Sequence, residues 1–166
     1  MSEMVFAYGS NMCSGRFRDY GIEPIGRGRA VSLDGYRLVF NKLSKKDGSG
    51  KANVSPSAGH EVWGVLYEIS DVDLALLDSG EGPGYRRSRL PVHITEGGLV
   101  DAWVYLAAKP STDAALRPYT WYKRFLVEGA REHMLPAQYV VELQAIDATD
   151  DLNLQRHEKR WALACT

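Results

Sequence analysis

Residues 76–89 read Leu-Leu-Asp-Ser-Gly-Glu-Gly-Pro-Gly-Tyr-Arg-Arg-Ser-Arg. Glu81 lies at the centre of this segment, with a glycine on each side. Because glycine has no side chain, a ligand can approach the backbone closely at such a place. A carboxylate on a tight turn with little bulk around it is well placed to act on a small molecule. The alternative is a solvated loop acid among glycines that only make a turn.

The residues on either side predict a helix before this turn and a strand after it. Ser70, with Asp73 three residues later, is an approximate capping box, which predicts the start of a short helix. The glycines and the proline of residues 80–84 are expected to end that helix. Residues 85–95 are rich in β-formers and predict a strand. The sequence therefore places Glu81 on a turn between a helix and a strand.

The composition is that of one folded domain with balanced charge. The 166 residues carry 20 basic and 21 acidic side chains, so no basic surface points to nucleic acid or to an anionic membrane. No apolar run approaches the ~20 residues that span a bilayer, and the first residues lack the regions of a signal peptide. Cys13 and Cys165 form neither a disulfide framework nor a metal-ligand pattern. These features together predict a reducing, cytoplasmic location.

A second segment that could bind a ligand or take part in catalysis follows the first predicted strand. Residues 4–8 form a short apolar run that ends in Gly9-Ser10-Asn11. In such a turn successive backbone N–H groups can converge on an anion or on a developing oxyanion. The side-chain amide of Asn11 can donate as well as accept a hydrogen bond. An ordinary Asx-type turn is the alternative interpretation.

The middle of the chain predicts a series of strands. Suitable patterns occur at residues 29–40 (with a turn at 33–36), 60–69, 86–95 and 99–107, the last two as a hairpin around Glu96-Gly97-Gly98. Residues 41–57 contain lysine, glycine, serine and asparagine, and predict an exposed loop with a short strand near 52–54. Gly48-Ser49-Gly50-Lys51 is not a phosphate-binding loop, because the first glycine of that motif would fall on Lys45.

The last third of the chain predicts helices. Residues 12–20 are either a short helix or irregular. Residues 119–133 and the segment from Pro136 onward carry apolar residues at helical spacing. Residues 151–165 are charged and predict a loose terminal helix or tail. Several strands followed by helices indicate an α+β fold with a mixed or antiparallel curved sheet. We expect one domain over residues 1–150 and a C-terminal tail or helix over 151–166.

Four segments, taken in order, resemble the γ-glutamylcyclotransferase family. Residues 6–12 are similar to its Tyr-Gly-Ser-Asn signature, residues 60–66 to its Glu-Val-Trp-Gly-Val strand, and residues 77–85 to its Leu-Asp-x-x-Glu-Gly…Tyr segment. Residues 122–136 resemble its C-terminal helix, loop and second helix. The resemblance covers residues 5–146. The sequence departs from the family pattern in the 41–57 loop and at His133-Met134, where the family has Asn-Gly.

The resemblance implies a small mixed, barrel-like sheet with helices packed around it and a single polar cavity. It implies that Glu81 is the catalytic acid/base and that Tyr122 donates its hydroxyl to the substrate. The turn formed by Tyr8, Gly9, Ser10 and Asn11 would bind either the oxyanion or the substrate's α-carboxylate. No metal or other cofactor is implied, and His60, His93, His133 and His157 show no ligand spacing.

The expected activity is that of a γ-glutamylcyclotransferase, which cyclises a γ-glutamyl compound to 5-oxoproline and releases an amine or amino acid. One alternative is removal of a γ-glutamyl protecting group from a larger metabolite by the same chemistry, with the 41–57 loop and the tail shaping a wider mouth. The other is a module that binds a small ligand without turnover. Asn11 favours this family over the related glutathione-degrading branch, whose signature usually has leucine there. The leaving amine is not readable from the sequence, and a homodimer stays open.

Overall fold

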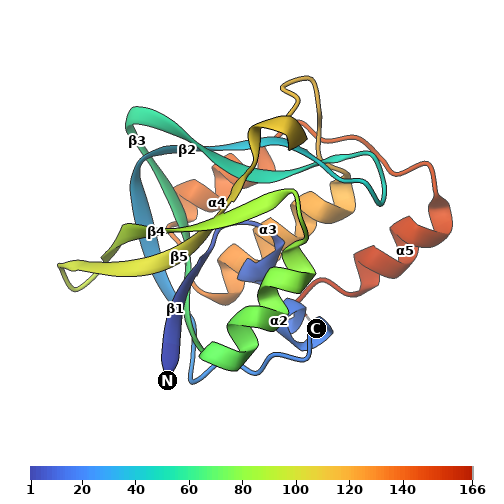
Figure 1. The fold of residues 1–166 in the computed structure, drawn as a ribbon. Helices are drawn as coiled ribbons and strands as arrows, with labels where there is room; N and C mark the ends of the chain where they lie inside the picture. The colour runs from blue at the N-terminus through green and yellow to red at the C-terminus, as the bar shows by residue number, and fades with distance from the viewer. Residues whose placement is uncertain (166) are drawn as a thin grey trace.

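A closed sheet of five strands forms the centre of the computed structural model, which describes residues 1–165 (Figure 1). Around the barrel the strands follow the order β1-β3-β2-β4-β5. Their bounds are β1 Ser2–Ala7, β2 Arg29–Leu43, β3 Gly50–Ser70, β4 Tyr85–Ile94 and β5 Leu99–Ala107. With helices packed around it, this barrel confirms the predicted α+β class and the barrel-like sheet.

β1 closes the barrel and carries the chain to the site. It pairs antiparallel with β3 along its length and parallel with β5 at Val5↔Trp103. Its last three residues, from Val5 to Ala7, are buried in the apolar core. The chain then passes through Tyr8 and Gly9 into the 3-10 turn η1, Ser10–Met12. The end of β1 is therefore held rigidly on both edges just before the turn that carries Asn11.

The helices confirm most of the sequence predictions. They are α1 Ser14–Asp19, α2 Asp71–Glu81, α3 Thr120–Glu132, α4 Ala137–Gln144 and α5 Leu154–Ala162, with a second 3-10 turn, η2, at Lys109–Ser111. The predicted apolar positions of α3, which are Tyr122, Phe125, Leu126 and Ala130, are all buried. None of the helices in residues 1–165 is long and apolar enough to cross a membrane.

The terminal helix α5 packs in a different way, because none of its residues is buried. Arg124 of α3 donates a hydrogen bond to the carbonyl of Trp161 at 2.8 Å, and its guanidinium lies 4.5 Å from the centre of the Trp161 ring. Before α5, the buried Asp151 accepts hydrogen bonds from Trp121 at 3.0 Å and from Arg156 at 2.6 Å. Polar and cation–π contacts therefore hold α5 against α3. Thr166, the last residue of the predicted tail, lies outside the described residues.

The prediction of an exposed loop over residues 41–57 was wrong, although the short strand expected near 52–54 is part of β3. β2 runs to Leu43 and β3 begins at Gly50, so most of the segment is a strand pair joined by a short turn. The turn predicted at 33–36 is a β-bulge between Asp34 and Tyr36 within one continuous strand. Cross-strand hydrogen bonds to a long partner strand outweigh the low β-propensity of the lysines, glycines and serines here.

The prediction that Glu81 lies on a turn was also wrong in detail. Ser70 caps α2 as expected, since its Oγ accepts a hydrogen bond from the N–H of Asp73 at 3.1 Å. The helix does not stop at Gly80 but continues to Glu81, its last residue. It ends at Gly82, whose φ of 78° favours a residue without a side chain. Glu81 is therefore fixed by a helix rather than by a loop.

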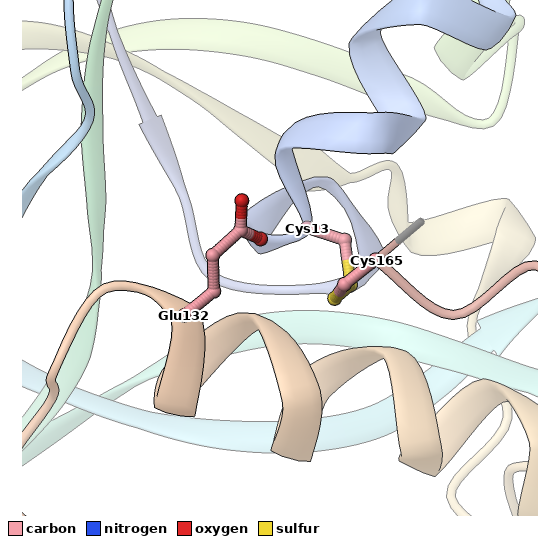
Figure 2. A group of neighbouring side chains, drawn as sticks. All are labelled: Cys13, Glu132 and Cys165. Atoms are coloured by element: carbon pink, nitrogen blue, oxygen red, sulfur yellow. A yellow bond between two sulfur atoms is a disulfide. The ribbon is translucent and has the colours of Figure 1, made fainter.

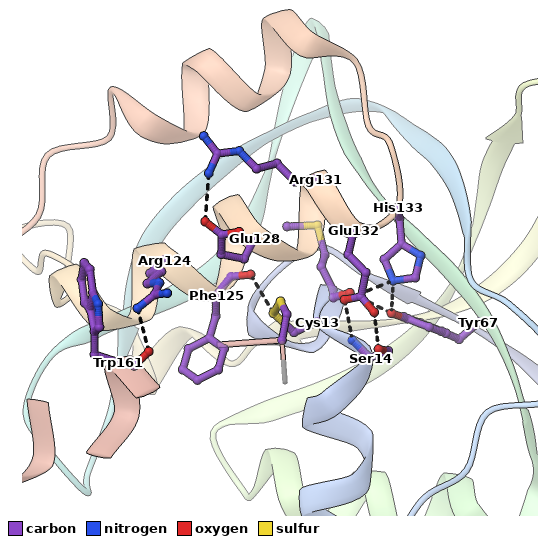
Figure 3. Close-up of a disulfide and its surroundings, with 12 residues drawn as sticks. Cys13, Ser14, Tyr67, Arg124, Phe125, Glu128, Arg131, Glu132, His133 and Trp161 are labelled. Carbon is purple, nitrogen blue, oxygen red and sulfur yellow. Dashed lines mark hydrogen bonds and ion pairs between the residues drawn. A yellow bond between two sulfur atoms is a disulfide. The ribbon is translucent and has the colours of Figure 1, made fainter. Parts of the chain in front are cut away.

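The interpretation that Cys13 and Cys165 form no disulfide framework was wrong as well. Cys13 and Cys165 form a disulfide across 152 positions of sequence, with their Cα atoms 4.9 Å apart. In Figure 1 the chain turns back after α5, drawn in red, toward α1, drawn in blue. Figure 3 shows the bond next to α3, where the Cys13 sulfur lies 3.2 Å from the carbonyl oxygen of Phe125. Sequence spacing could not predict this pairing, because only the fold brings the two residues together.

The disulfide is also part of the one group in residues 1–165 whose ligand atoms are close enough to hold a metal ion. Figure 2 shows the third member, Glu132 of α3, beside the two sulfur atoms. Metal ions bind the thiolate form of cysteine, and sulfur atoms joined to each other are not thiolates. Both carboxylate oxygens of Glu132 accept hydrogen bonds from Ser14, one from the N–H at 3.1 Å and one from the hydroxyl. This group is therefore built as a structural link between α1, α3 and the chain end.

Candidate active site

The two segments singled out in the sequence meet in space. Asn11 Nδ2 donates a hydrogen bond of 2.5 Å to Glu81 Oε1 across 70 positions of sequence. The pair borders a small cavity of about 40 Å³, which we call the inner pocket. All six candidate residues line it, namely Tyr8, Gly9, Ser10, Asn11, Glu81 and Tyr122. The fold thus places the first strand's turn and the end of α2 against one cavity, whose lining is part polar and part apolar.

Glu81 has the electrostatic environment of a proton acceptor that works near neutral pH. Burial raises the pKa of its carboxyl to about 7, while the hydrogen bond from Asn11 and the positive charges of Arg16 and Lys42 oppose the rise. The carboxyl also lies at the negative end of the α2 dipole, which disfavours a further negative charge. An ordinary glutamic acid, with a pKa of about 4.3, is a much weaker base.

Asn11 has a second, unused hydrogen-bonding atom. Its Nδ2 is committed to Glu81, whereas its Oδ1 is buried without a hydrogen-bond partner in residues 1–165. An unpaired buried acceptor costs about 1–3 kcal/mol, and a donor from a ligand would remove that cost. Because the acceptor lies beside the Glu81 carboxylate, this corner of the pocket suits a positively charged group with several N–H donors.

Tyrosines form part of the remaining wall, beside apolar residues of β1, α1, β3 and α2. The hydroxyls of Tyr122 and Tyr85 hold the Ala52 backbone between them: Tyr122 accepts from the Ala52 N–H at 3.1 Å, and Tyr85 donates to the Ala52 carbonyl at 2.6 Å. Tyr8 donates its hydroxyl proton to the carbonyl of Tyr105. Burial raises the pKa of Tyr122, so that it stays protonated. Among residues 1–165 its hydroxyl proton has no acceptor, and it is therefore available to a ligand.

A larger opening continues from the inner pocket, and we call it the outer cleft. Its volume is about 450 Å³, which is within the range of small-molecule sites. Four residues border both spaces, namely Ser10, Glu81, Tyr85 and Tyr122. The far walls come from the β2–β3 turn and from α5. Residues of the 41–57 segment and of the tail thus do line the mouth of the site.

Comparison with known proteins places these features in a family. Residues 61–143 match the AIG2-like family. Over 157 residues the chain is 31% identical to the Homo sapiens protein named gamma-glutamylcyclotransferase, covering 90% of this chain and 81% of that protein. The chain belongs to the γ-glutamylcyclotransferase family. The Mus musculus protein of the same name is 29% identical over 154 residues, covering 89% of this chain and 80% of that protein. A solved structure named gamma-glutamyl cyclotransferase superposes with a TM-score of 0.83 at 27% identity, covering 92% of each chain.

Sequence reasoning missed several residues of this family member's pocket. Tyr85 closes the family-like segment at residues 77–85, so its position in the site could have been inferred from that segment. Tyr105 lies on β5, and its only sequence signal was membership of an alternating strand. Ala52 contributes backbone atoms, and its position depends on the unexpected length of β3. Sequence patterns do not reveal a contribution made by the main chain.

Removing the amide of Asn11 tests its influence on Glu81. In Asn11→Ala we expect the pKa of Glu81 to rise above about 7, because the hydrogen bond that stabilises the carboxylate is lost. Turnover at pH 7 should fall roughly tenfold or more, and part of the loss should be recovered at pH 9. The measurement is the pH profile of kcat/KM. A uniform loss at every pH would show that Asn11 acts on the substrate alone.

Proposed function

We propose that this γ-glutamylcyclotransferase-type enzyme cyclises a γ-glutamyl compound to 5-oxoproline and releases the amine, with Glu81 as its acid/base. The observation that carries the assignment of Glu81 is its hydrogen bond to Asn11 at the border of the inner pocket, with a pKa near neutrality. At pH 7 a carboxyl group with that pKa is ionised in about half of the molecules, and once protonated it can give the proton back. A module that only binds a ligand has no need of such a group.

The reaction is intramolecular, so position supplies much of the rate. The substrate's α-amine attacks its own γ-carbonyl carbon, a C–N bond of the lactam forms, and the C–N bond to the leaving amine breaks. Well-oriented intramolecular reactions reach effective molarities of up to ~10⁸ M. A pocket that holds the γ-glutamyl chain folded therefore does a large part of the work before any proton moves.

Glu81 would move the protons. The α-ammonium must lose two protons to become the lactam nitrogen, and the leaving nitrogen must gain two to depart as an ammonium ion. The carboxylate takes them one at a time from the attacking nitrogen and delivers them to the leaving nitrogen, so it ends ionised as it began. A positioned carboxylate in this role is typically worth ~10² to 10⁴-fold in rate.

The remaining polar groups would hold the substrate. The unpaired Oδ1 of Asn11 suits the α-ammonium beside Glu81. The free proton of Tyr122 can be donated to a substrate oxygen. The turn of Tyr8 to Asn11 offers backbone N–H groups, either to the α-carboxylate or to the oxyanion of the tetrahedral intermediate. No step needs a metal ion or an organic cofactor.

The pH dependence of kcat/KM should report Glu81. We expect it to rise about tenfold for each pH unit below 7 and to level off near pH 7, because the carboxylate form is the active one. At higher pH it should fall again as the substrate's ammonium loses its proton. The measurement is initial rates over pH 5–10 with one γ-glutamyl substrate. An acid limb near pH 4.5 would mean that burial does not tune this group.

The activity itself is tested by chromatographic detection of 5-oxoproline from γ-glutamyl-alanine and from γ-glutamyl amines of increasing size. Release of 5-oxoproline with an equimolar amount of amine is the expected result. The volume of the outer cleft favours the variant in which a γ-glutamyl group is removed from a larger metabolite by the same chemistry. Binding of these compounds without any product would assign the cavity to ligand capture and overturn the proposal.

We also propose a cytoplasmic location and a homodimer. A cytoplasmic location has to accommodate the Cys13–Cys165 disulfide, because disulfides form mainly in oxidising compartments. Fractionation of cells with thiol trapping would decide both the compartment and the redox state. A homodimer stays a prediction, and sedimentation of the purified protein would test it.

A further inference from the structure

The outer cleft is strongly basic, although the chain as a whole is not. Seven basic side chains line it, namely Arg16, Lys42, Lys45, Lys46, Lys51, Arg156 and Arg160. The acidic side chains that line it are Asp47 and Glu81. With a formal net charge of −1 for the whole chain, these cations are a local concentration and not part of a generally basic surface.

Three of the seven cations are already neutralised. Lys51 pairs with Asp47 at 2.9 Å, Arg16 with Asp19 at 2.5 Å and Arg156 with Asp151 at 2.6 Å. The other four have no carboxylate within salt-bridge distance in residues 1–165. They are Lys42, Lys45, Lys46 and Arg160. The cleft therefore carries several positive charges that the protein itself does not balance.

Two of these four are held in place by aromatic rings rather than by acids. The Lys42 ammonium lies 4.9 Å from the centre of the Tyr85 ring, and the Arg160 guanidinium lies 5.6 Å from the Trp121 ring. Burial lowers the pKa of Lys42, and nearby Lys45 and Lys46 lower it further, which Glu81 and Asp47 oppose. An anion in the cleft would relieve this repulsion.

The cations come from two separate parts of the chain. Lys42, Lys45 and Lys46 lie at the end of β2 and in the turn after it, whereas Arg160 lies on α5. The disulfide and the hydrogen bond from Arg124 to Trp161 hold α5 against α3 (Figure 3), and this keeps Arg160 over the cleft. Cations from two elements that line one space of about 450 Å³ suit a compact anion of small-molecule size.

The position of the cleft says which part of the substrate would lie there. The inner pocket, at about 40 Å³, has room for only a small group at the Asn11–Glu81 end. The leaving amine must therefore extend past Glu81 and Tyr85, which border both spaces, into the outer cleft.

We propose that the outer cleft is a leaving-group subsite that selects γ-glutamyl compounds whose released amine carries two or more negative charges, as carboxylates or phosphate. This proposal rests on the cyclotransferase activity proposed above and specifies its substrate class. The unbalanced cations, their origin in two separate parts of the chain and the connection of the cleft to Glu81 together support it. A chain of nucleic acid fits the same charge less well, because the cleft is limited in size and the rest of the surface is not basic.

The test compares substrates whose leaving amines differ in charge. The panel is γ-glutamyl-alaninamide, γ-glutamyl-alanine, γ-glutamyl-glutamate, γ-glutamyl-phosphoserine and γ-glutamyl-lysine. At low salt we expect kcat/KM to rise about tenfold for each added negative charge, and the differences to shrink as KCl is added. The phosphoserine and glutamate substrates separate phosphate from carboxylate recognition. Equal or higher kcat/KM for the neutral and lysine substrates would overturn the proposal.

A double variant connects the preference to the cleft. In Lys46→Gln/Arg160→Gln the ratio of kcat/KM for γ-glutamyl-glutamate to that for γ-glutamyl-alaninamide should fall at least tenfold. Lys159→Gln is the matched control, since this exposed lysine is the neighbour of Arg160 on α5 but does not line the cleft. An unchanged ratio in the double variant, or an equal fall in the control, would contradict the assignment.

Failure of the activity and failure of this inference give different results. If none of the panel yields 5-oxoproline, the proposed function is wrong, but binding of the same compounds by calorimetry still measures the charge preference. If the compounds are turned over, Glu81→Gln serves for the same binding measurement, because its turnover is slow. Equal Kd values across the panel would overturn the subsite. Competition by a single-stranded oligonucleotide at lower concentration than γ-glutamyl-glutamate would assign the cleft to nucleic acid instead.

Discussion

Glu81→Gln is expected to lower kcat by roughly 10² to 10⁴-fold while leaving substrate binding nearly intact. Glutamine has almost the same shape, and its amide oxygen can still accept the hydrogen bond from Asn11 Nδ2. It cannot take a proton from the substrate's ammonium at neutral pH. The measurement is 5-oxoproline release under saturating substrate, with Kd obtained separately by calorimetry. A kcat within a few-fold of the unmodified protein would remove Glu81 from the mechanism.

The same variant should be more stable than the unmodified protein above pH 7. The folded-state pKa of Glu81 is about 7, well above the unfolded value near 4.5, so between these pH values the folded state keeps a proton that the unfolded chain has lost. The free energy of unfolding therefore falls as pH rises through this window. Glutamine removes the effect, and the gain at pH 8 should be on the order of 2 kcal/mol, vanishing near pH 4.

This gain separates lost chemistry from lost folding. An inactive variant that unfolds at higher urea concentration at pH 8 has kept its structure. Asp71→Asn is the matched control, because it also neutralises a carboxylate, at the opposite end of α2 and exposed to solvent. We expect its activity to be near that of the unmodified protein. A comparable loss in the control would mean that the charge of α2, rather than the base at residue 81, matters.

Breaking the disulfide is expected to have the largest effect on stability. The bond between Cys13 and Cys165 closes nearly the whole chain, and for a loop of this size the chain-entropy estimate is up to ~5 kcal/mol in free energy of unfolding. The actual loss should be smaller, because α5 buries no residue and regains freedom when released. Urea unfolding of Cys165→Ser, compared with the oxidised protein, measures it.

Cys165 is the better of the two positions to change. Cys13 is fully buried beside the Phe125 carbonyl, so a serine there would add a buried hydroxyl to the effect of the lost bond. Reducing agent should destabilise the unmodified protein and leave Cys165→Ser unaffected. Intact mass, lower by two hydrogens in the oxidised protein, reports the bond directly. Equal stability of oxidised, reduced and Cys165→Ser protein would show that the bond contributes nothing.

Local patterns predicted the elements whose stability is mainly local. α3 was read from apolar residues at helical spacing, and α2 from the capping serine at residue 70, because both signals act within a few residues of chain. The hairpin of β4 and β5 was read in the same way, from alternating side chains around a glycine pair. Each of these predictions depends on neighbours that are already close in sequence.

Local patterns misled wherever a distant partner decided the outcome. Residues 41–57 have weak β-propensity, yet pairing of β2 with β3 holds most of them in extended strands. Gly80 was expected to end α2, but the helix continues, and a side chain at this position would come within 2.6 Å of the Tyr20 ring. The glycine is there for close packing against another element, a reason that the sequence around it does not contain.

Sequence patterns were enough to identify the groups that carry chemistry: a Gly-Ser-Asn turn, a glutamate between glycines and a tyrosine on an amphipathic helix, in the order of a known family. Three features follow from folding instead: the hydrogen bond between Asn11 and Glu81, the rise of the Glu81 pKa to about 7 on burial, and the gathering of cations from distant parts of the chain in one cleft. The reason is physical. Residue type fixes what a group can do, whereas desolvation and Coulomb interaction depend on distances that the sequence does not contain.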